Sequence, residues 1–550
     1  MRRILYLLIA LGSGLFLGAF FFPVDEKISV SDISAAQRLS GTRFNNKEMD
    51  SLLPILEDFR KNYESLRKFN LGNSAPLAIQ FNPLPPGFVI DKMRVAFKTA
   101  SHEFTKFPKD SNDLSWYTIG QLAELIRTKQ ITSLGLTKFF IARLKKYDKK
   151  LLCVITLMEE LAYRQAKKAD EEIKEGRYKG ILHGIPYGIK DMFFTKDVKT
   201  TFGTTPFKDQ LIDEDAVVVK KLREAGAILI AKLSLGELAM DDTWYGGKTR
   251  CPWDTTKGSS GSSAGPASAV AAGLVPFAIG SETWGSIVSP CTVNGVTGLR
   301  PTFGRISRTG AMVLSWTMDK VGPICRNSED CAIVFNALLG PDPMDQTLTD
   351  LPFNYYPGQN LKKMKIGYLV KEFEKDSANK KFNDEFIALL KSKDVELIPV
   401  TLPDLPVNDL AIILFSECSE AFHELSISDR DDLMAQQGKY NWPNFFRSGH
   451  FIPAVQYLRA NRVRYKLMQE MNEKMKGLDI LLAPSLAGDN LLVTNLTGHP
   501  CVVIPNGFIG EKTPVSIVAI GQLYDEGKLL SFTNTVQLLT EWHKKHPKGF

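Results

Sequence analysis

The sequence predicts an α/β fold, because strand-like and helix-like segments alternate along most of the chain. The strand-like segments are short apolar runs, and the helix-like segments carry apolar residues three and four positions apart. With 550 residues, of which 44% are hydrophobic, the chain can bury a large core. The alternation comprises a helix capped by Asp215 and ended by Gly226, a strand over 227–231, a strand over 365–370, a helix over 379–392, a strand over 395–400, and late strands over 502–504 and 515–520.

The chain opens on an apolar segment of about the length that crosses a membrane. Arg2 and Arg3 precede a run from Ile4 to Phe22 that contains no charged residue. Because about 20 apolar residues span a bilayer core and positive charges favour its cytoplasmic side, residues 1–24 are predicted to be a transmembrane anchor. The rest of the chain would then lie outside the cytoplasm, in the periplasm of a bacterium. The alternative is a cleaved signal segment and a secreted or periplasmic protein, although residues 20–22, all phenylalanine, stand where signal cleavage needs small residues.

Residues 25–115 are predicted to be a helical and extended N-terminal extension ahead of a main domain over 116–550. Apolar residues between 31 and 69 share one helical face, which we expect to pack against the main domain; a partner helix or a coiled coil is the alternative. This face consists of Leu52, Ile55, Leu56, Phe59, Tyr63 and Leu66. The proline-rich residues 70–89 are predicted to be an extended strap, and helices over 118–128 and 133–147 follow.

Composition excludes several classes of partner and cofactor. The net charge of +7 is spread along the chain without a basic block, so no nucleic-acid partner is expected. Seven cysteines, an odd number without a CxxC pair, favour neither a metal site nor a disulfide scaffold, and Cys325 and Cys331 are predicted to be free buried thiols. Gly14 and Gly18 form a GxxxG in the apolar segment, which leaves a homodimer open.

A Gly/Ser-rich stretch between Gly258 and Phe303 is too regular in its apolar content to be a linker. Small residues over 264–272 predict a helix closed by Gly273, and an apolar strand over 275–279 follows. Serine-bearing turns flank this helix and strand. Because glycine lets backbone N–H groups approach a ligand oxygen closely, the pattern is typical of a rigid active site.

Three motifs in this order resemble the amidase signature family, and the resemblance extends from about residue 118 to residue 530. The motifs are Gly184-Ile185-Pro186 with Lys190-Asp191, then Ser260-Gly261-Ser262-Ser263-Ala264-Gly265, and finally Glu282-Thr283-Trp284-Gly285-Ser286-Ile287 with Pro290. The chain departs from the third motif at three positions. Glu282 replaces aspartate, Trp284 replaces the first of two glycines, and Val288 replaces an arginine.

The resemblance implies an amidase-signature fold, in which helices surround a large mixed, twisted sheet, and a Ser–cis-Ser–Lys triad that uses no metal or other cofactor. Ser286 would be the nucleophile, Ser262, after a cis peptide bond, the proton relay, and Lys190 the base. Lysine has an ordinary pKa of about 10.4, so burial must lower the pKa of Lys190 for it to act near neutral pH. The oxyanion hole would be formed by the backbone N–H groups of Thr283, Trp284, Gly285 and Ser286.

Several functions are compatible with these motifs. The first is a free-standing amidase that acts on small or peptide-like amides; the second is the glutamine-hydrolysing A subunit of a tRNA-dependent amidotransferase, which an exported, anchored chain disfavours because that protein works in the cytoplasm. A degenerate scaffold is disfavoured by the retained triad. Residues 261–265 also fit the G-x-S-x-G nucleophile elbow of α/β-hydrolases, with Ser263 as nucleophile and His499 as its base. The elbow requires a preceding strand, whereas residues 255–258 are polar and turn-like.

Overall fold

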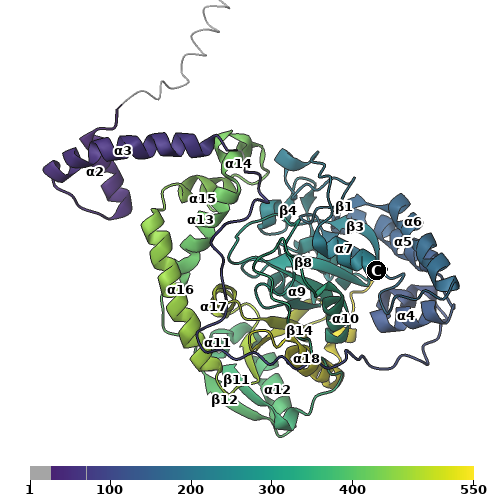
Figure 1. Ribbon diagram of the computed structural model, residues 1–550. Helices are drawn as coiled ribbons and strands as arrows, with labels where there is room; N and C mark the ends of the chain where they lie inside the picture. The colour runs from purple at the N-terminus through teal and green to yellow at the C-terminus, as the bar shows by residue number, and fades with distance from the viewer. Residues whose placement is uncertain (1–26, 70) are drawn as a thin grey trace, which may run out of the picture. The chain divides into compact units, whose positions relative to one another are not determined.

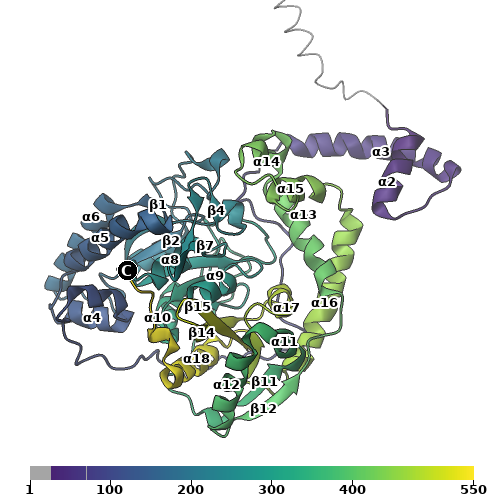
Figure 2. The ribbon, with the colours of Figure 1, turned by 180° about the vertical axis from the view of Figure 1, so that it is seen from behind.

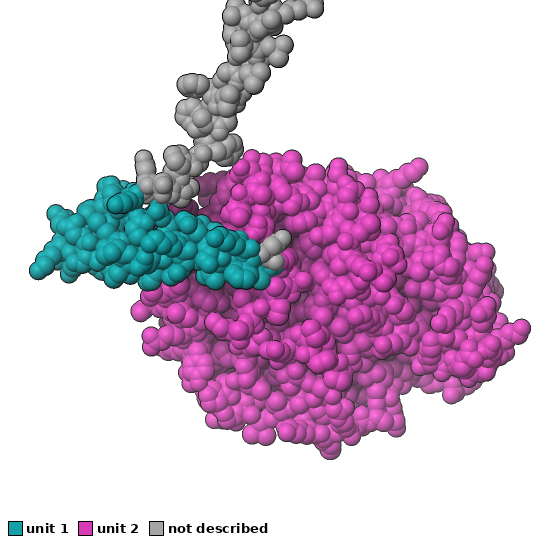
Figure 3. Space-filling model, turned by 45° about the horizontal axis from the view of Figure 1, so that its top comes forward, with its two compact units in different colours: residues 1–71 teal, residues 72–550 magenta. Residues whose placement is uncertain are grey.

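The computed structural model describes residues 27–69 and 71–550, which fall into two compact units, 1–71 and 72–550 (Figure 3). The predicted anchor or signal segment over 1–24 lies outside the described residues. Among those that are described, no helix combines the length and apolar composition needed to cross a bilayer.

The described residues of the first unit form two helices, α2 (Val30–Ser40) and α3 (Asn46–Arg67), which confirms the helical pattern. Ser29 and Asn45 cap them through reciprocal side-chain and backbone hydrogen bonds with Asp32 and Glu48. Gly41 ends α2 in the left-handed conformation that glycine adopts readily.

The second unit contains one 11-stranded mixed sheet in the order β1-β3-β2-β8-β10-β9-β14-β15-β13-β11-β12. Strand β2 is parallel to both β3 and β8, whereas β10 is antiparallel to β8 and β9. The strands are β1 (Val154–Leu157), β2 (Pro186–Lys190), β3 (Ile228–Leu233), β8 (Phe277–Glu282), β9 (Thr297–Arg300), β10 (Lys320–Cys325), β11 (Lys365–Leu369), β12 (Glu396–Val400), β13 (Ile480–Pro484), β14 (Cys501–Ile509) and β15 (Thr513–Gly521). The predicted large mixed sheet is therefore confirmed.

Helices surround this sheet (Figures 1 and 2). Helices α5 and α6 pack together near β1 and β3, and α16 runs beside α13 on the other side of the unit. The helices are α4 (Ile119–Arg127), α5 (Ser133–Leu151), α6 (Glu159–Lys174), α7 (Val217–Glu224), α8 (Ala264–Ala271), α9 (Val288–Asn294), α10 (Ser328–Leu338), α11 (Val370–Lys375), α12 (Lys380–Lys391), α13 (Ile412–Ala421), α14 (His423–Ile427), α15 (Trp442–Gly449), α16 (Ala454–Met475), α17 (Asn490–Thr497) and α18 (Glu526–Thr540).

Two local predictions were wrong. Asp215 does not cap α7, whose N-cap residue is Ala216. The Asp215 carboxylate instead accepts a hydrogen bond from the Lys196 amide and pairs with Arg223. Residues 255–258 are not a turn but belong to strand β7 (Asp254–Gly258), which pairs with β6 (Arg250–Cys251). The polar side chains of β7 misled the prediction because most of them are exposed at a small two-stranded ribbon.

All seven cysteines are buried and free, as predicted for Cys325 and Cys331.

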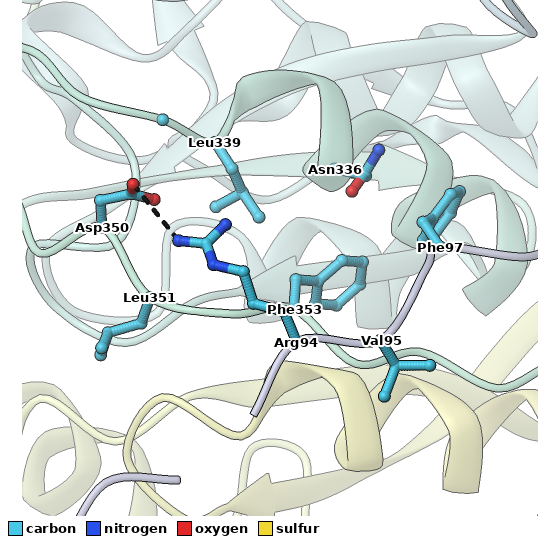
Figure 4. Close-up of a pocket in the computed structure, with 9 residues that line it drawn as sticks. Arg94, Val95, Phe97, Asn336, Leu339, Asp350, Leu351 and Phe353 are labelled. Atoms are coloured by element: carbon cyan, nitrogen blue, oxygen red, sulfur yellow. Dashed lines mark ion pairs between the residues drawn. The ribbon is translucent and has the colours of Figure 1, made fainter. Parts of the chain in front are cut away.

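The strap predicted over 70–89 is extended, since its described residues 71–89 contain neither helix nor strand, and the extended chain continues to residue 110. The Asn73 side chain donates to the carbonyl groups of Val313 and Ala421, and the Phe81 ring lies 3.6 Å from the Arg464 guanidinium. Farther along, Arg94 and Phe97 border a cavity of about 300 Å³ beside α10, where Arg94 pairs with Asp350 at 3.5 Å (Figure 4). None of the candidate catalytic residues lines this cavity.

Candidate active site

The sheet brings the first and third motifs to the same edge. Lys190 is the last residue of β2, and β8 ends at Glu282, four residues before Ser286. The two strands are parallel neighbours, with Ile189 opposite Ile279. Parallel strands end at a common edge, so the fold places Lys190 beside the start of the turn that carries Ser286.

Lys190 is fully buried and makes two hydroxyl contacts. Its Nζ lies 2.7 Å from Oγ of Ser262 and 2.9 Å from Oγ of Ser281. The Ser281 hydroxyl in turn donates to Sδ of Met192. Burial lowers the pKa of Lys190 to about 7, against the opposing charges of Asp319 and Glu282. A substantial fraction of this amine is therefore neutral at neutral pH.

The two serine-bearing turns are tied together through the backbone. The Ser263 amide donates to the Ser286 carbonyl group at 3.1 Å, and the Gly261–Ser262 peptide bond is cis, as the resemblance implied. A side chain at residue 261 would collide with the Asp241 carbonyl oxygen, which explains the glycine. Within the described chain no hydrogen bond joins the Ser262 and Ser286 hydroxyls, and Ser286 is 9% exposed. The structure therefore brings Lys190 to Ser262, and the catalytic roles of the three residues stay a prediction.

The turn after β8 presents a row of backbone donors. The four N–H groups from residue 283 to residue 286 have no hydrogen-bond acceptor among the described residues. Gly285 has φ +88°, a conformation that side chains rarely adopt. Unpaired, rigidly held amides of this kind are the groups that stabilise an oxyanion in other enzymes.

The buried carboxylate of Glu282 anchors this turn through hydrogen bonds to both of its oxygens. One carboxylate oxygen accepts from the amides of Ile287 and Val288, and the other accepts from Arg300 and Asn495 at 2.8 Å each. Burial favours the neutral acid, but the charge of Arg300 and these hydrogen bonds outweigh it and lower the pKa of Glu282 to about 2. Although the third motif has valine in place of arginine at position 288, this carboxylate has a guanidinium partner in Arg300 of β9.

A second carboxylate holds the other side of the turn. The Thr283 hydroxyl donates to Asp319, whose other oxygen accepts from the amides of Leu314 and Ser315. The motifs did not reveal Asp319, Ser281 or Asn495 as site residues. Ser281 directly precedes the third motif and could have been found from its position; Asp319 and Asn495 are distant in sequence and carry no such signal.

The nucleophile-elbow alternative receives no support from the contacts of its residues. Ser263 is fully buried, and its hydroxyl both donates to the Ser281 carbonyl group and accepts from the Ser281 amide. His499 is bonded to the Thr497 hydroxyl, and burial together with the Arg300 charge lowers the pKa of its ring to about 3. Both side chains are therefore engaged in structural hydrogen bonds.

Replacing Arg300 with methionine is expected to destabilise the protein by about 3–5 kcal/mol, because the Glu282 carboxylate would stay buried without its positive partner. Urea denaturation of purified protein measures the change. Arg127→Met is the matched control: this arginine is 53% exposed in its pair with Glu124, so its loss should change the free energy of unfolding far less than the loss of Arg300. Equal losses in the two variants would contradict the anchoring role of Arg300.

Comparison with known proteins agrees with this geometry. The sequence pattern of the Amidase family matches residues 135–491, more than half of the chain. The fold and the matched region define an amide-hydrolysing enzyme, and the chain belongs to the amidase family.

Individual relatives include both kinds of protein considered above. The chain is 31% identical to the A subunit of the glutamyl-tRNA(Gln) amidotransferase from Coxiella burnetii, over 78% of this chain and 99% of that protein. It resembles the structure of the native peptide amidase from Stenotrophomonas maltophilia with a TM-score of 0.70 and 26% identity, over 77% of this chain and 97% of that one. An amidase family protein from Bacillus anthracis gives a TM-score of 0.71 and 27% identity, with 78% and 92% covered.

Proposed function

We propose that this enzyme cleaves a carboxamide C–N bond through an acyl-enzyme on Ser286. The Ser286 oxygen attacks the carbonyl carbon while its proton passes to Ser262, and the Ser262 proton passes to the neutral amine of Lys190. Return of a proton along the same path to the leaving nitrogen allows the C–N bond to break. Water then hydrolyses the ester, which releases the carboxylic acid and restores the Ser286 hydroxyl.

The contact between Lys190 and Ser262 carries this proposal. An amine with a pKa of about 7 that lies 2.7 Å from a hydroxyl can act as its base near neutral pH. The Ser281 hydroxyl accepts a second hydrogen bond from the Lys190 amine, and this bond fixes the orientation of the amine. The unpaired amides from residue 283 to residue 286 would bind the oxyanion, and removal of one such donor costs about 3–4 kcal/mol in comparable enzymes.

We propose a free-standing amidase of small or peptide-like amides in preference to a component of an amidotransferase. The similarity to the A subunit of a glutamyl-tRNA(Gln) amidotransferase supports the second candidate. The match covers 99% of that relative but only 78% of this chain. The unmatched part of this chain is long enough to hold the N-terminal extension and the apolar segment. Assaying the purified chain alone against aryl, fatty, amino-acid and peptide amides and against glutamine separates the candidates. Hydrolysis of glutamine only, and only with added partner proteins, would favour the amidotransferase.

The apolar segment before residue 24 is proposed to anchor the enzyme in a membrane, with its catalytic unit outside the cytoplasm. Full-length protein should remain with membranes after a carbonate wash, and protease added to the outer side should digest it. Deleting residues 1–24 should give an active enzyme that no longer sediments with membranes, because the candidate catalytic residues lie far downstream. Recovery of a mature form that starts near Pro23 would establish a cleaved signal segment instead.

A further inference from the structure

Trp284 is exposed in an otherwise buried turn. This residue is 40% exposed, whereas Thr283 and Ser286 are buried. It stands two residues before the proposed nucleophile, at the position where the family motif has glycine. A large apolar ring therefore lies open to solvent beside the candidate reaction centre.

The environment of Trp284 differs from that of every other tryptophan of the chain. Within the described residues, the Trp284 indole has neither a hydrogen-bond acceptor for its N–H group nor an aromatic ring or cation against it. The indole N–H groups of four others donate to backbone carbonyl groups, and the remaining two rings contact other aromatic side chains. The four are Trp244, Trp253, Trp316 and Trp442, and the two are Trp116 and Trp542. Hydrogen bonds and ring contacts in the folded chain thus account for six of the seven tryptophans but not for Trp284.

Hydrogen bonds hold the backbone before Trp284 at residues 282 and 283 and after it at residues 287 and 288, so the point from which its side chain extends is fixed. Thr283 is held by Asp319, and Glu282 is held by Arg300 and two backbone amides. Beside the turn, Cδ1 of the partly buried Leu491 lies 3.6 Å from where a Cβ of Gly285 would stand. Leu491 belongs to α17, which is bonded to Glu282 through Asn495. The turn therefore combines polar backbone donors with apolar side chains.

We infer that Trp284 selects substrates that carry an aromatic ring next to the scissile carboxamide, through stacking of that ring on the indole. This inference rests on the proposed function and narrows its substrate to aryl amides and amides of aromatic amino acids. Aromatic rings attract one another beyond the area they bury, and an indole offers a large, rigid surface for such a contact. Because every residue type except proline keeps its backbone N–H, substitution at position 284 removes the ring and leaves the proposed oxyanion donor in place.

The test compares kcat/KM for benzamide with kcat/KM for cyclohexanecarboxamide, which is similar in size but not aromatic. Wild-type enzyme should prefer benzamide, and Trp284→Leu should lower that preference, the ratio of the two kcat/KM values, roughly ten-fold. Trp284→Phe should keep most of the preference. Trp542→Leu, which removes an indole that packs against Phe508, serves as the control and should leave the ratio unchanged.

A binding measurement separates this inference from the proposed chemistry. Titration calorimetry of benzamide into Ser286→Ala should show binding that weakens roughly ten-fold when Trp284→Leu is added. If benzamide binding depends on Trp284 but the wild-type enzyme hydrolyses no amide, the stacking of the aromatic ring on Trp284 stands and the proposed function is overturned. An unchanged substrate ratio in Trp284→Leu, or an equal loss on both amides, would overturn the inference even if the enzyme is an active amidase.

Discussion

Ser286→Ala is expected to lower kcat for amide hydrolysis by about 10⁴–10⁶-fold while leaving the fold intact. Loss of the nucleophile removes the acyl-enzyme route, and triad deletions in comparable enzymes have effects of this size. The side chain makes no hydrogen bond within the described residues, so its removal should leave the free energy of unfolding nearly unchanged. Single-turnover rates and urea denaturation of the same preparation measure both effects.

Ser263→Ala is the matched control, because it removes a neighbouring serine hydroxyl from the same site. This hydroxyl bonds the Ser281 backbone, so the variant should lose some stability but far less activity than Ser286→Ala. More than a tenth of the wild-type rate in Ser286→Ala would make the nucleophile assignment wrong. The reverse ranking of the two variants would favour the nucleophile elbow.

The rate should rise with pH through about 7 as Lys190 loses its proton. Only the neutral amine can accept the Ser262 proton, so kcat/KM falls when pH drops below the pKa of Lys190. Burial lowers this pKa far below the ordinary value of about 10.4, as expected from the sequence. Lys190→Ala should lose this pH dependence together with nearly all activity. Lys190→Arg should not restore it, because a guanidinium stays protonated.

The pH profile alone does not identify the base, because a pKa of about 7 lies close to that of an ordinary histidine. Full burial of the Lys190 side chain explains why its pKa falls into this range. His499→Gln therefore serves as a control and should leave the profile in place, since its ring is bonded to Thr497. A profile that disappears in His499→Gln but persists in an active Lys190→Ala would contradict the assignment.

Local sequence signals sufficed for the framework of the site. A short apolar run located β8, and small residues closed by Gly273 located α8, because these elements are specified by patterns within a few residues. The motifs then placed Lys190 and Ser262 in contact before any geometry was known. Polar residues at an exposed ribbon produced the error at β7, where pairing with β6 overrides local propensity.

The supporting shell could not be predicted because it depends on tertiary packing. Nothing in the sequence joined Arg300 to Glu282 across the sheet. Asn495 reaches the same carboxylate from α17, more than 200 positions away in the sequence. The chain departs from the family motif at positions 282 and 288, and the Glu282 carboxylate nevertheless accepts two hydrogen bonds at each of its oxygens.

The central claim, that Ser286 is an activated nucleophile, is tested most directly by labelling with a fluorophosphonate. Such reagents phosphonylate a serine whose proton is removed by a neighbouring base. Mass spectrometry of wild-type protein should show one added group on the peptide that contains Ser286, with labelling that slows below pH 7, and no addition to Ser286→Ala or Lys190→Ala. A label on Ser263, or unlabelled wild-type protein that still hydrolyses amides, would contradict the account.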